Sequence, residues 1–256
     1  MSVGVVTGAA SGMGRACVDR LRGTVDHLIA VDIRDPALEG TIGYPCDVSD
    51  LADVRSLVDL VAQYGPFRFL AHAAGLSPTM AEPRRIVAVN LVGTAYLLDA
   101  FEPIVTARSA AVCFASSAGY IPLELLGPEL AELIRDPLAA DLVDRAGALL
   151  TDSGMAYAWS KKGVQLAAAT AAISWGSRGG RVISVSPGLV DTPMGRLELE
   201  NQPVMQAMLN ATPLRRFGTP HELAAIVAFA LSDDASFLSG VDILVDGGQA
   251  AASVAP

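Results

Sequence analysis

Short runs of consecutive hydrophobic residues alternate along the chain with longer stretches in which hydrophobic positions recur at helical spacing. The run at residues 28–31 is apolar at every position, which is typical of a strand buried on both faces of a parallel sheet. Such runs predict strands at residues 3–7, 27–32, 41–47, 67–74, 109–115, 181–186 and 241–246. The patterns between them predict helices at residues 12–22, 51–63, 83–101, 155–176 and 220–232. This alternation predicts one α/β domain over residues 1–256, a doubly wound (Rossmann), mostly parallel seven-stranded sheet with helices on both faces.

Two segments interrupt the regular alternation. Residues 120–154 are longer than an ordinary strand–helix loop and contain helical patterns at 123–135 and 138–150, so we expect a helical insert there. Residues 195–210 follow the carboxyl end of a strand, where long loops often close over ligands, and we expect a substrate lid. Apolar side chains would line its pocket, namely Met194, Leu197, Leu199, Met205, Met208 and Leu209. Alternatively, these side chains pack on the scaffold without touching a substrate.

Composition narrows the range of functions. No run approaches the roughly 18 uncharged apolar residues of a membrane span, and no basic leader precedes the first apolar stretch. We therefore expect a cytoplasmic protein without a membrane partner. The net charge of −9 argues against a nucleic-acid partner, because phosphate binding needs a basic surface. No metal site is expected, since the three histidines are widely separated. The cysteines are interpreted as reduced packing residues: Cys17, Cys46 and Cys113.

A glycine-rich turn follows the first predicted strand and leads into a helix. Residues 7–14 read Thr-Gly-Ala-Ala-Ser-Gly-Met-Gly. Gly8 permits a tight turn, Gly12 lets the backbone approach a pyrophosphate, and Gly14 allows close helix–strand packing. The free N–H groups at the start of the helix, contributed by the Ser11 and Met13 region, would hold the phosphates. An ordinary glycine-rich turn is the alternative interpretation.

An acidic residue at the end of the second predicted strand favours the nucleotide interpretation. Asp32 lies 18 residues after Gly14, where an acid that binds the ribose is expected. Its carboxylate can accept the adenosine ribose hydroxyls and would repel a 2′-phosphate, so we expect NAD as the cofactor, with Ile33 beside the adenosine. Arg34 leaves NADP open, because a nearby guanidinium can accommodate the extra phosphate.

The spacing Thr-Gly-x-x-x-Gly-x-Gly resembles the short-chain dehydrogenase/reductase family, and further segments resemble it in the same order over nearly the whole chain. Residues 46–48 (Cys-Asp-Val) resemble its adenine-contacting turn, and residues 72–75 (His-Ala-Ala-Gly) its Asn-Asn-Ala-Gly element, with both asparagines replaced. Residues 186–192 resemble the loop that holds the nicotinamide carboxamide. Besides the glycine turn and the acid, the resemblance implies cofactor contacts by Cys46, Asp47, Val48, Ala74, Gly75, Pro187, Gly188, Val190 and Thr192.

The segment 157–161 (Tyr-Ala-Trp-Ser-Lys) carries the chemistry that the resemblance implies. Residues four apart share one face of a helix, so Tyr157 and Lys161 can flank the same nicotinamide ribose. A free tyrosine has a pKa near 10, and a nearby lysine cation should lower it toward the working range. The family pattern Ser-x-x-Gly selects Ser116 at the end of the fifth predicted strand, with Ser117 as the alternative.

In the implied mechanism, the Tyr157 phenolate takes the alcohol proton while hydride leaves the carbinol carbon. Ser116 would stabilise the charge that develops on the substrate oxygen. Lys161 would lower the tyrosine pKa and bind the ribose hydroxyls. Asn90, in a Val-Asn-Leu segment that matches the family's active-site asparagine, would hold a water linking Lys161 to solvent. Alternatively, Asn90 is bonded only to local backbone.

The gap of 41 residues between Ser116 and Tyr157, together with the sequence of residues 31–35, resembles the bacterial 3α-hydroxysteroid dehydrogenase/carbonyl reductase branch of the family. This resemblance implies a hydrophobic secondary alcohol or ketone as substrate, such as a hydroxysteroid. The alternatives are a 3-oxoacyl-thioester reductase and a non-catalytic dinucleotide-binding regulator. The family also implies a homo-oligomer, a dimer or a tetramer.

Overall fold

One sheet organises the molecule, which the computed structural model describes at residues 1–196 and 203–254. Its strands are β1 (Val3–Thr7), β2 (His27–Asp32), β3 (Ile42–Pro45), β4 (Phe67–His72), β5 (Ala110–Phe114), β6 (Arg181–Pro187) and β7 (Asp242–Val245). They lie in the order β3-β2-β1-β4-β5-β6-β7, and every neighbouring pair is parallel. The predicted doubly wound fold is confirmed. The direction of winding reverses between β1 and β4, which is where such sheets bind ligands.

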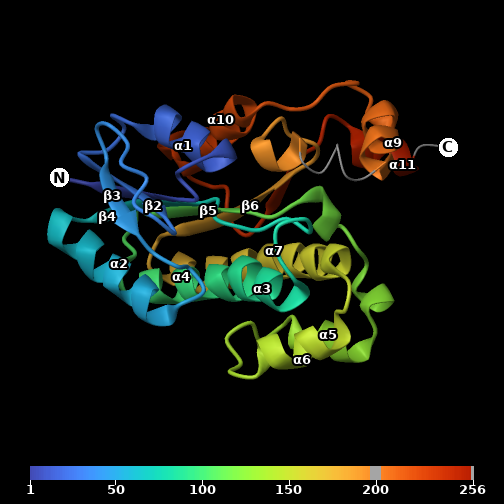
Figure 1. Ribbon diagram of the computed structural model, residues 1–256. Coiled ribbons are helices and arrows are strands. Elements are labelled where there is room, and N and C mark those ends of the chain that lie inside the picture. The colour runs from blue at the N-terminus through green and yellow to red at the C-terminus, as the bar shows by residue number, and fades with distance from the viewer. Residues whose placement is uncertain (197–202, 255–256) are drawn as a thin grey trace.

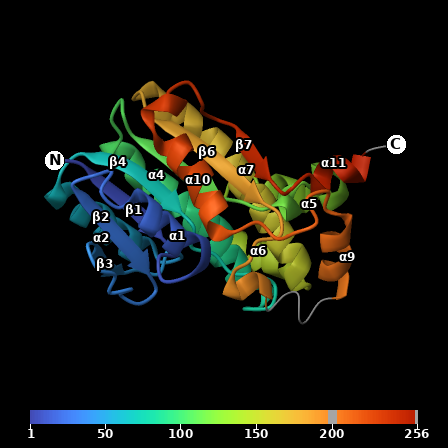
Figure 2. The same ribbon diagram turned by 90° about the horizontal axis from the view of Figure 1, so that it is seen from above.

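Helices cover both faces of the sheet (Figure 1). On one face lie α1 (Gly12–Leu21) and α10 (Pro220–Leu231), and on the other lie α2 (Leu51–Tyr64), α4 (Gly93–Phe101) and α7 (Ser153–Ser177). Figure 2, seen from above, shows α1 and α10 side by side over the strands. Shorter elements are α3 (Pro83–Val87), η1 (Ala88–Val92), η2 (Glu102–Ile104), η3 (Ser117–Gly119), η4 (Leu123–Leu126), α5 (Pro128–Leu133), α6 (Leu142–Leu149), α9 (Pro203–Ala211), η5 (Asp233–Ala235) and α11 (Gln249–Val254).

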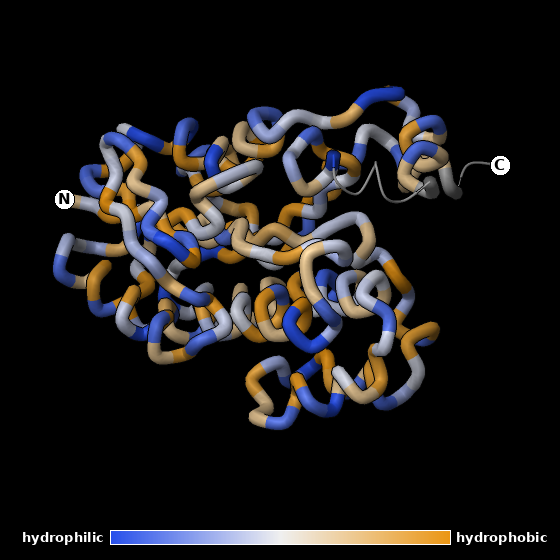
Figure 3. The backbone as a smooth tube through the Cα atoms, in the orientation of Figure 1, coloured by the Kyte–Doolittle hydropathy of each residue, from blue (hydrophilic) through white to orange (hydrophobic). Residues whose placement is uncertain are grey.

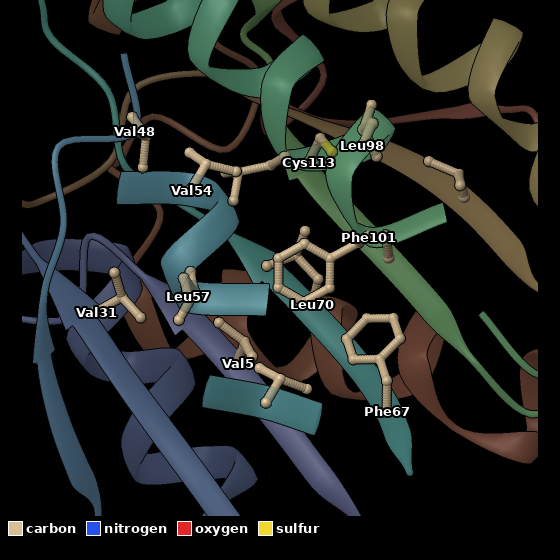
Figure 4. Packing of buried hydrophobic residues seen from close by; sticks show 14 of the residues in the cluster. Val5, Val31, Val48, Val54, Leu57, Phe67, Leu70, Leu98, Phe101 and Cys113 are labelled. Carbon is tan, nitrogen blue, oxygen red and sulfur yellow. The ribbon is translucent and has the colours of Figure 1, made fainter. Parts of the chain in front are cut away.

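Each face of the sheet buries its own hydrophobic cluster, because successive strand side chains point to opposite faces. On one face, Leu70 of β4 packs against Leu57 of α2 and Phe101 of α4 (Figure 4). The Phe67 ring lies 4.9 Å from the Phe101 ring and 5.9 Å from the Trp175 ring, centroid to centroid. Along the helices in Figure 3, hydrophobic and hydrophilic residues alternate, as expected of elements with one buried and one exposed face.

The helical stretch Pro83–Ile104 is long and apolar enough to cross a membrane by composition alone. However, 67% of its most apolar window is buried inside the protein. It packs against α2 and α7, so its hydrophobicity is that of a core helix.

The structure corrects several predicted boundaries. The strand predicted at residues 41–47 is limited to β3, and the strand predicted at residues 67–74 ends at His72. Beyond His72 the backbone leaves the sheet, because the Ala74 N–H donates to the Thr7 hydroxyl and not to a strand partner. The helix predicted at residues 83–101 is divided by η1, a π-helical turn that contains Asn90. The second helix of the insert begins at Leu142 and not at residue 138.

The insert at residues 120–154 contains η4, α5 and α6 and packs against the start of α7. Its core joins Leu133 and Leu142 to Ile86 of α3 and Trp159 of α7, all of which are buried. The Trp159 indole N–H also donates to the Leu130 carbonyl at 3.1 Å. The insert therefore braces the turn of α7 that carries Tyr157.

The segment predicted as a lid is described only in part, because Leu197 and Leu199 lie outside the described residues. Met205 of α9 is buried and lines a cavity together with Met194. Met208 and Leu209 are half-buried and line neither of the cavities near the predicted active site.

Candidate active site

The turn after β1 has the conformation that its glycines favour. Gly8 and Gly12 have φ angles of +67° and +54°, a region that other L residues rarely adopt. A Cβ atom on Gly14 would lie 2.0 Å from the Gly8 carbonyl oxygen, so no side chain fits there. Ser11, the N-cap of α1, makes no side-chain capping bond. The first N–H groups of α1 therefore have no capping side chain and can bind phosphate oxygens.

A cleft of about 270 Å³ opens where β1, β2, β3 and β4 end. It brings together most of the predicted cofactor residues, which are Gly8, Ser11, Gly12, Met13, Gly14, Asp32, Ile33, Cys46, Asp47, Val48, Ala74, Gly75 and Thr192. Met194, which we predicted for the substrate pocket, also lines this cleft, as do residues that the sequence did not mark as cofactor contacts: Thr7, Ala73, Leu76, Met80, Arg85, Val89 and Pro193. An uncapped helix start, glycines without room for a side chain and a carboxylate at the rim together fit a dinucleotide.

Asp32 lies at the rim of this cleft. Its Oδ2 accepts the Ala10 N–H at 2.9 Å and its Oδ1 accepts the Ile33 N–H at 2.8 Å, so the backbone orients the carboxylate. Each of these oxygens can accept a second hydrogen bond, which leaves capacity for ribose hydroxyls. A 2′-phosphate at this carboxylate would be repelled. Arg34 is exposed and does not line the cleft.

Arg85 of α3 reaches the adenine end of the predicted site. Its guanidinium donates to Asp47 Oδ2 at 2.8 Å and to Ser49 Oγ at 2.7 Å. The other oxygen of Asp47 accepts the Ser49 N–H and hydroxyl. Burial opposes the charge, but the hydrogen bonds from Ser49 and Arg85 hold the pKa of Asp47 below its usual value. The guanidinium and the carboxylate thus form one fixed polar wall of the cleft.

A smaller cavity, about 70 Å³, adjoins the cleft at Met13, Thr192 and Met194, which line both. The predicted catalytic residues Ser116 and Tyr157 lie on its wall. The residues predicted for the nicotinamide loop also lie on this wall, namely Pro187, Gly188, Val190 and Thr192. Met205, predicted for the substrate pocket, lies there too, together with Leu189 and Phe217, which the sequence did not indicate. The cavity therefore combines two hydroxyl groups with an apolar lining beside the dinucleotide cleft.

The loop after β6 is held closely against β7. The Gly188 N–H donates to the Val245 carbonyl at 3.0 Å, and a Cβ on Gly188 would lie 2.8 Å from the Asp246 Cα. Thr192 Oγ1 accepts the Gly195 N–H at 2.9 Å. Close backbone packing against β7 therefore requires glycine at position 188, a reason that the motif alone did not show.

Tyr157 and Lys161 lie one turn apart on α7, whose N-cap Asp152 accepts the Met155 N–H at 2.8 Å. Tyr157 is half-buried at the cavity, whereas Lys161 lies behind it, only 6% exposed. The ammonium is 5.8 Å from the centre of the phenol ring and donates to the Phe114 carbonyl at 2.7 Å. Burial lowers the pKa of Lys161 to about 8. The pair can thus place a cation behind a phenol that faces a ligand.

The two candidate serines differ in their surroundings. Ser116 is buried at the wall of the small cavity, and its hydroxyl accepts the Ala118 N–H at 3.2 Å. That bond fixes the oxygen and leaves the hydroxyl proton for another acceptor. Ser117 begins η3 and does not line the cavity. The geometry brings Ser116, and not Ser117, together with Tyr157.

Asn90 lies in η1 and lines neither cavity. Its side chain accepts the Leu76 N–H at 2.8 Å and donates to the Leu76 carbonyl at 2.9 Å. It thereby holds the backbone that follows β4. The backbone carbonyl of Asn90 accepts the Thr94 hydroxyl at 2.6 Å. The side chain is therefore bonded to backbone 14 residues away and not to local backbone, and its amide also donates to Ser160 Oγ at 3.4 Å.

The three cysteines are buried and free, as expected of packing residues. Burial raises the pKa of each thiol to about 12. Within residues 1–196 and 203–254, no three or more His, Cys, Asp or Glu side chains are arranged to hold a metal ion.

The known proteins that this chain resembles include dehydrogenases and reductases. A family model described as "Enoyl-(Acyl carrier protein) reductase" matches residues 8–124 and 144–250, and the unmatched stretch falls within the insert. The 3-alpha-hydroxysteroid dehydrogenase/carbonyl reductase of Comamonas testosteroni is 29% identical over 97% of this chain and 96% of its own length. An uncharacterized short-chain type dehydrogenase/reductase of Sinorhizobium fredii is 34% identical over 95% of this chain, which spans only 43% of that protein.

Solved structures show the same fold. The crystal structure of the 3-alpha-hydroxysteroid dehydrogenase from Pseudomonas sp. B-0831, complexed with NADH, matches with a TM-score of 0.83. The two sequences are 29% identical, and the match covers 99% of this chain and 98% of that one.

Proposed function

The chain belongs to the short-chain dehydrogenase/reductase family, and we propose that it transfers a hydride between NAD(H) and a secondary alcohol or ketone. The observation that carries the proposal is the cavity shared by Ser116 and Tyr157, with the Lys161 ammonium 5.8 Å behind the phenol ring. This cavity adjoins a cleft whose glycine turn and carboxylate fit a dinucleotide. A relative of the same fold is complexed with NADH, which supports the same cofactor here.

Bound NAD supplies the hydride acceptor, its nicotinamide ring. During oxidation the Tyr157 phenolate takes the proton of the substrate hydroxyl, and during reduction the neutral phenol returns it. The Lys161 ammonium favours the phenolate by its charge and binds the ribose hydroxyls. Ser116 donates its hydroxyl proton to the substrate oxygen and stabilises the charge that develops there.

The remaining predicted residues would hold the cofactor. The uncapped start of α1, with Ser11, Gly12 and Met13, would bind the pyrophosphate, and Asp32 the adenosine ribose. Asp32 also favours NAD over NADP, because it would repel a 2′-phosphate. For Asn90 we keep the proposed role of holding a water beside Lys161. Its carbonyl has a second lone pair besides the one that accepts the Thr94 hydroxyl.

The apolar lining of the small cavity supports a hydrophobic substrate such as a hydroxysteroid. Met13, Met194 and Met205 are flexible side chains that can adapt to a bulky ring system, and Leu189 and Phe217 extend the apolar wall. A steady-state screen of steroids, aliphatic ketones and acyl thioesters with NADH tests this proposal. Turnover with thioesters alone would support instead the 3-oxoacyl-thioester reductase, the activity nearest to the description of the matching family model.

The decisive variant is Tyr157→Phe, which removes only the hydroxyl. We expect turnover with any accepted alcohol to fall at least about 10³-fold, while the Kd for NADH, measured by fluorescence, changes little. Tyr64→Phe is the matched control, because Tyr64 lies at the end of α2 with its ring 5.1 Å from His27. Turnover at the wild-type level in Tyr157→Phe would exclude the assigned base. NADH binding by the wild type without turnover of any carbonyl would favour a regulator.

We further propose a cytoplasmic homo-oligomer, a dimer or a tetramer. Residues 134–138 of the insert line a groove with Leu98 of α4 and with Leu166 and Thr170 of α7. The insert thus flanks the outer face of these two helices, and assembly would use a different surface, at the edge strand β7. Two apolar side chains are exposed in the segments that precede β7 in the sequence, Phe229 on α10 and Phe237 after η5.

A further inference from the structure

A buried histidine connects the dinucleotide turn to the active-site helix. His72 is the last residue of β4 and is 2% exposed. Its Nδ1 lies 2.7 Å from the hydroxyl of Thr7, which immediately precedes Gly8, and its Nε2 lies 2.9 Å from the hydroxyl of Thr94 on α4. In the family pattern that residues 72–75 resemble, this position is asparagine, so the arrangement is a property of this chain.

The direction of each hydrogen bond follows from the acceptor at one end. The Thr94 hydroxyl lies 2.6 Å from the Asn90 carbonyl, which can only accept, so Thr94 donates its single proton there. The Thr94 oxygen must then accept from Nε2–H of His72. A neutral imidazole has one N–H, so Nδ1 accepts the Thr7 hydroxyl proton. The Thr7 oxygen in turn accepts the Ala74 N–H at 3.2 Å. Every donor in this chain has an acceptor.

The two ends of this series of hydrogen bonds enclose the backbone beside the catalytic lysine. The series starts at the Ala74 N–H and ends at the Asn90 backbone carbonyl. The Asn90 side chain also binds both polar backbone groups of Leu76. Between them lies Gly75, where a Cβ would be 3.2 Å from Asn90 Oδ1 and 3.5 Å from Lys161 Nζ. These hydrogen bonds therefore hold residues 74–76, which form the wall against which the Lys161 ammonium lies.

We propose that His72, held as the neutral Nε2–H tautomer, is a positioning residue that fixes this wall and thereby keeps Lys161 behind Tyr157. The inference rests on the proposed function for its consequence in turnover, but the hydrogen-bond direction and the state of Lys161 can be measured without turnover.

Burial and a neighbouring charge keep the His72 imidazole neutral, so its tautomer does not change with pH. Burial lowers the pKa of His72 to about 3, and the Lys161 ammonium acts in the same direction. On the neighbouring strand, burial raises the pKa of the Cys113 thiol to about 12, so that group is neutral. The ring is therefore neutral throughout the pH range in which the enzyme would work, and the hydrogen bonds keep one direction.

The first test is the tautomer itself, read from the ¹⁵N chemical shifts of the imidazole nitrogens in protein labelled with ¹⁵N-histidine. The sequence has only three histidines, and His27→Gln and His221→Gln assign the other two signals by their disappearance. We expect one protonated Nε2 and one unprotonated Nδ1 for His72 from pH 5 to pH 9. A protonated Nδ1, or an imidazolium in that range, overturns the proposal.

The second test compares Thr94→Val, which removes the hydroxyl, with Thr94→Ser, which keeps it. Lys161 and Lys162 are the only lysines, so protein labelled with ¹³C-lysine reports the pKa of Lys161 directly. In Thr94→Val we expect the loosened wall to admit water and raise that pKa by about one unit, with kcat about tenfold lower and the KM for NAD nearly unchanged. Thr94→Ser should restore both values. Wild-type values in a folded Thr94→Val, or no rescue by serine, refute the positioning role.

A failure of the proposed function has a different signature. If the wild type transfers no hydride to any alcohol or ketone, kcat cannot be compared, but the tautomer and the Lys161 titration still decide whether the chain of hydrogen bonds exists and holds the lysine. If Thr94→Val does not fold, the ¹⁵N measurement on the wild type together with the Lys161 titration of His72→Gln decides in the same way.

Discussion

Replacing Lys161 with methionine separates the stability of the fold from the chemistry of the site, because the ammonium is buried. Its pKa is lowered from 10.5 to about 8 by burial. A difference of about 2.5 units corresponds to about 3 kcal/mol, at roughly 1.36 kcal/mol per unit. The lysine is 6% exposed, so solvent screening reduces this value little.

The sign of the pH dependence follows from proton binding. Between pH 8 and pH 10.5 the unfolded chain binds a proton at Lys161 that the folded chain has released, so the free energy of unfolding rises with pH across this window. The penalty is fully present below pH 8 and is relieved above pH 10.5. Methionine has a similar length and no charge, so Lys161→Met should remove the penalty at every pH.

The expected gain in Lys161→Met is smaller than the full penalty. The substitution also removes the bond from Nζ to the Phe114 carbonyl, which contributes about 1 kcal/mol. We therefore expect the variant to be about 2 kcal/mol more stable than the wild type at pH 7, with turnover lost. At pH 10.5 this advantage should fall to about zero or reverse.

Urea unfolding at pH 7 and pH 10.5, followed by circular dichroism, measures both differences. Lys162→Met is the matched control, since Lys162 is the neighbouring residue of α7, half-buried, with its ammonium 3.5 Å from Gln165 Oε1. The reasoning is refuted if Lys161→Met loses the same stability at both pH values, or if the ¹³C titration of Lys161 in the wild type has its midpoint near 10.5.

Three further predictions concern the cofactor and assembly. In Asp32→Asn we expect kcat/KM with NAD to fall about tenfold and the preference over NADP to shrink, measured by parallel assays, because the charge that repels a 2′-phosphate is gone; an unchanged preference would contradict this role. In Arg85→Gln we expect the KM for NAD to rise several-fold with kcat unchanged, because Asp47 loses the guanidinium that holds it; a fall in kcat alone would exclude that explanation. In Phe237→Glu we expect light scattering to show a smaller assembly, because a charge replaces an apolar side chain that is fully exposed in the single chain; an unchanged mass would place the interface elsewhere.

The elements could be predicted because their signals are local. Consecutive apolar positions revealed the buried parallel strands, and the glycine spacing revealed the turn that Gly8 and Gly12 form with positive φ angles. The strand boundaries were less accurate where tertiary contacts decide them. β4 ends at His72 because the Ala74 N–H donates to the Thr7 hydroxyl, and no local pattern records a partner 67 residues away.

The partners of polar side chains were the part that the sequence did not reveal. Arg85 pairs with Asp47 across 38 residues, and only the folded chain shows that both line the same cleft. Asn90 could be found from its motif, but not that its amide would hold Leu76. His72 was visible only as a departure from a family pattern, and its meaning depends on two hydroxyl groups from β1 and α4.

The buried polar groups of this site also bear on whether the chain is an enzyme or a binding regulator. Binding a dinucleotide needs the glycine turn, the start of α1 and Asp32, all of which lie in or beside the cleft. A ribose contact alone does not require the ammonium to be buried 5.8 Å from the centre of a phenol ring, a placement that costs about 3 kcal/mol of stability when its pKa is about 8. A polar group that breaks the packing rules is expected where function requires it. The position of Lys161 therefore favours catalysis at Tyr157, and a stabilised, inactive Lys161→Met that still binds NADH would be its direct demonstration.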